Sequence, residues 1–123
     1  MGKTTVILAA LLLSSTLSAA DESAAATRSP GDMSTEQRVA MMRTANEYNK
    51  CVYEQALENI DADEDIRRIA DIAMGACQGH LDGLGETIIA WGYPDYFATR
   101  FTHNVRDRAA RKLIPELAIR KSN

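Results

Sequence analysis

Hydrophobic residues in the middle of the chain recur at steps of three and four, the spacing of an α-helix with one buried face. The first such pattern consists of Met41, Ala45, Tyr48, Val52 and Ala56. The second consists of Ile66, Ile69, Ala70, Ala73, Cys77, Leu81 and Leu84. A short acidic segment separates the two patterns. Together they predict an antiparallel pair of helices joined by a tight turn.

The acidic segment predicts where the second helix begins. Asp61 and Glu64 have the spacing of a capping box, in which each side chain satisfies a free backbone N–H group. The carboxylates of Asp63 and Asp65 also favour the positive end of the following helix dipole. We therefore expect this helix to start near Ala62.

The first helix is expected to run from about Thr35 to Asn59, because Ser34 and Gln37 have the spacing of another capping box. The segment 33–37, MSTEQ, also resembles the LTxxQ motif of Spy- and CpxP-like periplasmic stress proteins, with Met for Leu and Ser for Thr. Those proteins carry two copies and this chain has one. The resemblance implies an exported stress protein, while helix capping explains the same five residues.

A third helical pattern follows after Gly92 and Pro94 and predicts a helix that covers the hairpin. Its apolar positions are Phe97, Phe101, Val105, Ala109, Leu113 and Leu117. Pro115 is expected to kink or end this helix near Ile114, because proline lacks the N–H group that a helix interior requires. Residues 85–91 either extend the second helix or form a short one. The expected fold class is all-α, a small bundle of three to four helices.

The two cysteines lie at nearly equal distances from the predicted turn, since the midpoint of positions 51 and 77 is 64. In an antiparallel helix pair, residues equidistant from the turn lie side by side. We therefore expect a Cys51–Cys77 disulfide, worth about 3.5 kcal/mol in the loop-entropy model. The absence of a CxxC spacing argues against a redox pair.

The N-terminus has the pattern of an export signal. Lys3 is followed by an apolar run over residues 6–13 and by small residues at Ser18 and Ala20, which predicts a signal peptide over residues 1–20. Residues 21–33 read as a flexible leader, and residues 34–123 as a single helical domain without a membrane span. The expected location is the periplasm of a Gram-negative cell, or outside the cell.

Charge is unevenly distributed. Residues 21–95 hold 6 basic and 15 acidic residues, a net of −9, whereas residues 96–123 hold 7 basic and 2 acidic residues, a net of +5. Either the basic last helix lies against the acidic hairpin, or its basic face meets an anionic partner. That candidate face consists of Arg100, Arg106, Arg108, Arg111 and Lys112. The overall charge of −3 argues against nucleic acid as the partner.

Three glycines, Gly75, Gly79 and Gly83, recur every fourth residue in the second helical pattern. Each costs about 1 kcal/mol relative to alanine in a helix interior, so their presence needs a reason. The helix could end near Gly79, the third helix could pack closely on a ridge of small residues, or the glycines could form a groove for an external helix or a second copy. Near the following turn, aromatic residues are expected to plug the open end of the hairpin: Trp91, Tyr93, Tyr96, Phe97 and Phe101.

The sequence offers little that resembles an active or metal site. Asp61, Asp63 and Asp65 start like a calcium-binding loop, but Ile66 and Ile72 occupy the positions that require Gly and Glu. No metal site, cofactor or catalytic residue is assigned. We expect a non-enzymatic exported protein that binds another exported protein, as an inhibitor, immunity protein or adaptor does. The alternatives are a stress chaperone and a metal binder that uses His80, His103 and nearby methionines.

Overall fold

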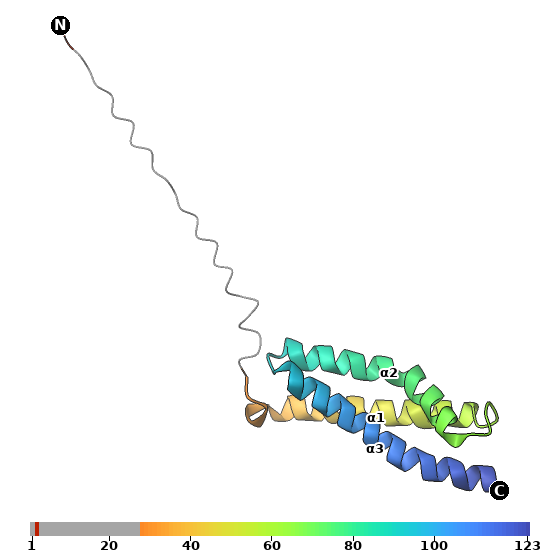
Figure 1. Cartoon of the computed structure of the whole chain (residues 1–123). Helices are drawn as coiled ribbons and strands as arrows, with labels where there is room; N and C mark the ends of the chain where they lie inside the picture. The colour runs from red at the N-terminus through yellow and green to blue at the C-terminus, as the bar shows by residue number, and fades with distance from the viewer. Residues whose placement is uncertain (1, 3–27) are drawn as a thin grey trace.

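A computed structural model describes Gly2 and residues 28–123, and this part of the chain contains three long α-helices. They are α1 (Thr35–Glu58), α2 (Ile66–Ala90) and α3 (Asp95–Ser122), preceded by a 3-10 turn, η1 (Pro30–Asp32). Figure 1 shows α2 running back along α1, and α3 running obliquely across this hairpin toward the α1–α2 turn. The predicted all-α fold is confirmed, with three α-helices. Apart from Gly2, the predicted signal peptide and residues 21–27 of the leader lie outside the described residues.

The buried faces of α1 and α2 follow the apolar periodicity. All five predicted positions of α1 are buried, and Tyr48 is 0% exposed. Every predicted position of α2 is buried except Ile66, which is half-buried, and Met74 and Ile88 are buried as well. Most of these side chains form one core with buried residues of α3, and Met41, Leu84 and Ile88 belong to a second cluster, so the packing of apolar faces holds the three helices together.

The predicted disulfide joins α1 to α2. Cys51 and Cys77 are bonded, with their Cα atoms 6.0 Å apart. Cys77 is buried in the core and Cys51 packs against it. The bond fixes the axial register of the two helices, because it forms only when these two positions lie opposite each other.

The start of α2 differs from the prediction. The helix begins at Ile66 rather than near Ala62, and its N-cap is Asp65, whose Oδ1 accepts a hydrogen bond from the Arg67 N–H at 2.9 Å. Asp61 and Glu64 therefore do not form the predicted capping box. The chain needs residues 59–64 to reverse direction, so the last acidic residue before the apolar pattern becomes the cap.

The helix α2 runs without interruption to Ala90, so residues 85–90 extend it, and a helix end near Gly79, one of the three explanations for the glycines, is excluded. Gly92 then provides the reversal, since its φ of 95° lies in the left-handed region that glycine adopts without strain. Its N–H donates to the Ile89 carbonyl at 2.9 Å.

A second hydrophobic cluster closes the open end of the hairpin. Its buried residues are Met33, Met41, Leu84, Ile88, Tyr93 and Ala98, with Trp91, Phe97 and Phe101 packed against them. Four of the five predicted aromatic residues thus form the plug, while Tyr96 is 64% exposed. Tyr93 also donates a hydrogen bond to Gln37 Oε1 at 2.6 Å, which ties the α2–α3 turn to the start of α1.

Residues 28–33, assigned to the leader from the sequence, pack on this end of the bundle. The Arg28 N–H donates to the Gly92 carbonyl at 3.1 Å, and the Arg28 guanidinium lies 5.2 Å from the centre of the Tyr93 ring. Met33 is buried in the second cluster. Within the described residues, the segment 28–33 therefore packs on the bundle through single residues, which the sequence pattern of a Pro- and Gly-containing segment does not reveal.

The helix α3 passes through Pro115 and continues to Ser122, so of the two predicted effects, a kink or an end near Ile114, the end is wrong. Pro115 is exposed, and it has no N–H group to donate to the carbonyl four residues earlier. Leu113 and Leu117 on either side of it are buried in the core and hold the helix in place.

Breaking the disulfide tests the register. Cys51→Ser is expected to lower the free energy of unfolding by about 2–5 kcal/mol, measured by urea denaturation. Reductant should lower the stability of the wild type to a similar level and leave the variant unchanged. An unchanged urea midpoint would show that the pair contributes nothing to the folded state.

Two buried tyrosines provide a matched test of the core. Within the described residues the Tyr48 hydroxyl is buried without a hydrogen-bond partner, whereas the Tyr93 hydroxyl has one. Tyr48→Phe is therefore expected to leave stability unchanged or raise it by about 1 kcal/mol, while Tyr93→Phe lowers it by about 1 kcal/mol. Thermal and urea unfolding measure the stability of both variants. Equal losses of stability would contradict the assignment of a hydrogen bond to the Tyr93 hydroxyl and of none to the Tyr48 hydroxyl.

Candidate functional site

The three glycines of α2 form an exposed strip, here called the glycine flank (Gly75, Gly79 and Gly83). A Cβ atom built on any of them would meet nothing within 4 Å. The predicted ridge for close packing of α3 is therefore wrong, because α3 lies on another side of α2. Gly85, which the sequence analysis did not single out, is the glycine that faces α3, with Thr102 Cγ2 4.0 Å from its Cβ position.

The flank continues into small and apolar neighbours. Ile72 is 44% exposed and Ala76 is exposed, and both share the outer face of α2 with the glycines. The backbone of α2 is thus uncovered over about two turns. Of the three explanations that the sequence allowed for the glycines, only a surface for an external helix or a second copy is not contradicted.

The five basic residues of α3 do not form one surface. Arg106 turns toward α2, where its guanidinium donates to Gln78 Oε1. Arg108 and Lys112 line a hollow between α3 and α1. Arg100 and Arg111 are exposed, and about 100° per residue places both on the side of α3 away from the buried positions. The predicted basic face is thus divided among three directions.

The basic helix packs on the acidic hairpin without forming ion pairs to it. Among the described residues, the ion pairs within 4.0 Å are local: Lys50–Glu54, Arg68–Asp63 and His103–Asp107. The contacts of α3 with the hairpin use neutral acceptors, including the Tyr53 hydroxyl, which accepts from Arg120 at 2.7 Å. Much of the positive charge of α3 is therefore not neutralised by the hairpin.

A groove lies between α1 and α3, and the sequence analysis did not anticipate it. The two backbones come close at only a few positions, whereas α2 contacts both neighbours extensively. One hollow of about 240 Å³ is lined by Met42, Ala45, Asn46, Asn49, Phe101, Asn104, Val105, Arg108 and Lys112. A second, of about 170 Å³, is lined by Asn49, Val52, Tyr53, Ala109, Lys112, Leu113 and Glu116. Asn49 and Lys112 line both hollows, so the two are adjacent, and together they are here called the α1–α3 groove.

Two buried polar atoms lack hydrogen-bond partners among the described residues, the Tyr48 hydroxyl and Asn49 Oδ1. Burial raises the pKa of Tyr48, and the nearby positive charge of Arg106 partly opposes this effect. Asn49 lines the α1–α3 groove, but its unpartnered oxygen is buried rather than exposed at that surface.

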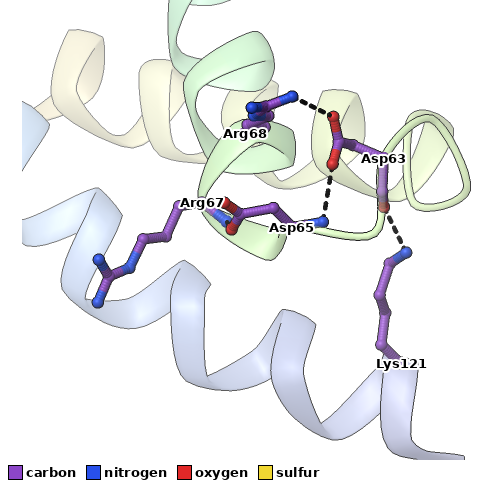
Figure 2. Close-up of polar contacts among 5 residues, drawn as sticks. All are labelled: Asp63, Asp65, Arg67, Arg68 and Lys121. Carbon is purple, nitrogen blue, oxygen red and sulfur yellow. Dashed lines mark hydrogen bonds and ion pairs between the residues drawn. The ribbon is translucent and has the colours of Figure 1, made fainter.

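The acidic turn anchors the C-terminal end of α3. Figure 2 shows Asp63 at its centre, where Oδ1 accepts from the Asp65 N–H at 2.8 Å and Oδ2 pairs with Arg68 at 3.4 Å. The Lys121 ammonium donates to the Asp63 carbonyl from α3. The Asp65 N–H, together with the charges of Arg68 and Lys121, lowers the pKa of the Asp63 carboxyl. These contacts therefore hold the α1–α2 turn together and connect it to the end of α3.

The residues considered for metal binding are distributed over the molecule. Met33, Met41 and Met74 are buried in the hydrophobic clusters, and Met42 is exposed on α1. His80 lies exposed on α2, while His103 on α3 pairs with Asp107 at 3.3 Å. The described residues contain no group of three or more His, Cys, Asp or Glu side chains placed to hold a metal ion.

Nowhere in residues 28–123 does a helix combine the length and the apolar character required to cross a bilayer. Comparisons with protein-family models, with curated proteins and with solved structures found no match for this chain.

The acidic turn makes stability depend on pH. Because the folded-state pKa of Asp63 is lowered, its carboxylate stabilises the fold above the ordinary pKa of about 3.9, and this contribution is lost as the pH falls through and below that value. Asp63→Asn should therefore flatten the loss of stability in acid, measured by urea unfolding from about pH 6 to pH 3. Asp61→Asn, in the same turn, is the control; an equal effect would contradict the role of Asp63.

Proposed function

We propose that this chain is an exported, non-enzymatic helical protein that acts by binding another exported protein through its exposed helix surfaces. The signal-peptide pattern of residues 1–20 supports export. The Cys51–Cys77 bond is compatible with it, since disulfides persist mainly in oxidising compartments.

The observation that carries the proposal is the exposed glycine flank. At each of its three positions alanine would fit, because a Cβ has free space and the backbone is helical. Replacing glycine by alanine in a helix interior stabilises it by about 1 kcal/mol. The isolated fold would therefore be more stable without these glycines, so packing within the chain does not explain them.

A binding role explains them, because a helix surface without side chains lets another backbone approach closely. Distances between packed helix axes depend on the side chains at the contact, and glycine gives the shortest. Ile72 at one end of the flank adds apolar area that such a contact would bury. A helix or an extended segment of a partner suits this surface.

Substitutions at Gly79 separate folding from binding. Gly79→Ala and Gly79→Leu are both expected to raise the free energy of unfolding, by up to about 1 kcal/mol, because leucine and alanine favour helix and have room. Crosslinked capture of the tagged protein from its native exported fraction, read by mass spectrometry, should yield one dominant partner that Gly79→Leu loses. Ala118→Leu, on the exposed side of α3, is the control for added bulk. Identical capture by all variants, or no partner, would contradict the proposal.

A further inference from the structure

The α1–α3 groove is the open side of the bundle, and it continues along α1. Next to the two hollows lies a shallow depression lined by Arg38, Val39, Met42, Arg43, Asn46, Glu47 and Lys50, which shares Met42 and Asn46 with the larger hollow. Together these surfaces extend along α1 from Arg38 to Tyr53. At a rise of about 1.5 Å per residue, this is a length of about 24 Å.

The floor and one edge of the groove are apolar. Val105, Ala109 and Leu113 of α3 and Ala45 and Val52 of α1 form the floor. At the edge, Val39 is 50% exposed and Met42 is 54% exposed. Val39 and Met42 lie close together, because they are about one turn apart on α1. Covering them would remove apolar surface from water, which favours binding.

The rim of the groove is basic on an acidic protein. Among the charged residues, Arg108, Lys112 and Glu116 line the two hollows. With Arg38, Arg43, Lys50 and Glu47 of the adjoining depression on α1, the combined surface has five basic and two acidic side chains. This is a net charge of +3, whereas the whole chain carries −3. No carboxylate of the described residues lies within 4.0 Å of Arg43, Arg108 or Lys112. The rim is therefore complementary to an acidic occupant.

We propose that the α1–α3 groove binds an amphipathic, acidic α-helix of the exported partner, which would complete a four-helix arrangement on the side where α1 and α3 are apart. This inference rests on the proposed protein-binding function and names the chemistry of its partner. The length of the groove suits a helix of about 16 residues. The apolar face of that helix would cover Met42 and the floor, and its carboxylates would pair with Arg108 and Lys112.

A second copy of this chain does not fit the groove as well. Its exposed large hydrophobic residues are scattered over three helices: Val39 and Met42 on α1, Ile72 and Ile89 on α2, Tyr96 and Ile119 on α3. No described helix therefore presents an exposed apolar stripe of the length of the groove. The acidic residues of α2 flank glycines, which have no side chain to fill the hollows.

The test uses a fluorescent amphipathic peptide of about 16 residues, built from leucine, alanine and glutamate, and the mature protein. A peptide of the same pattern with lysine for glutamate is its control. At about 0.15 M ionic strength, fluorescence anisotropy should show saturable binding of the acidic peptide only. The double charge reversal Arg108→Glu with Lys112→Glu should weaken binding by about tenfold or more. The matched reversal Arg100→Glu with Arg111→Glu, away from the groove, should weaken it by less than about threefold.

Equal weakening by both reversals would overturn the proposal, because it would show attraction to net charge rather than to this groove. Binding of both peptides, or of neither, would overturn it as well. A spin label on the acidic peptide provides a test on the wild type, independent of variant folding. It should broaden amide signals of residues 38–53 and 101–116; broadening centred on residues 72–83 would overturn the groove assignment while supporting the glycine flank.

Analytical ultracentrifugation of the protein alone tests whether a second copy of this chain occupies the groove. Self-association that the Arg108 and Lys112 reversal abolishes would assign the groove to a second copy and overturn the proposal. Conversely, a partner whose capture depends on Gly79, with no binding of the acidic peptide, would support the proposed function and reject only this inference.

Discussion

The register between α1 and α2 is the constraint on which the rest of the structure depends. Apolar residues on facing sides of the two helices bury each other, and the Cys51–Cys77 bond fixes which turn lies opposite which. Tyr48 and Ile69, both 0% exposed, lie in the core that results. A shift of one residue would rotate the apolar faces away from each other, so the bond and the core specify the same arrangement. That agreement gives α3 a defined surface on which to pack.

The position of α3 is set at both of its ends. At the start, the Gly92 turn and the second hydrophobic cluster join α3 to α2, and Tyr93 reaches Gln37 on α1. At the end, Lys121 contacts the Asp63 carbonyl in the α1–α2 turn (Figure 2). Between these anchors α3 crosses the hairpin obliquely (Figure 1) and stays closer to α2 than to α1. The α1–α3 groove is the geometric consequence of that crossing.

The two surfaces proposed for binding, the glycine flank and the α1–α3 groove, contain residues that do not favour the stability of the fold. Glycine is a poor helix residue, yet three of them occupy exposed positions of a 25-residue helix. Unpaired basic side chains gather around the α1–α3 groove on an acidic chain. In a sequence selected for stability alone such conflicts would be removed, so their presence is what directs the functional proposals to these surfaces.

The sequence by itself determined the helices, their buried faces and the disulfide, because each depends on spacing along the chain. Positions along the sequence are enough to give the helical period of Met41, Tyr48 and Val52. They also give the equal distances of Cys51 and Cys77 from the turn. Tertiary structure decided which residues are exposed and which distant segments contact each other, because spacing along the chain does not contain this information. It placed the glycines on the solvent side of α2, separated Arg106 from Lys112, and anchored Arg28 and Met33 on the bundle. It also created the α1–α3 groove. All of these depend on how α3 crosses the hairpin, which is set by contacts between residues far apart in the sequence.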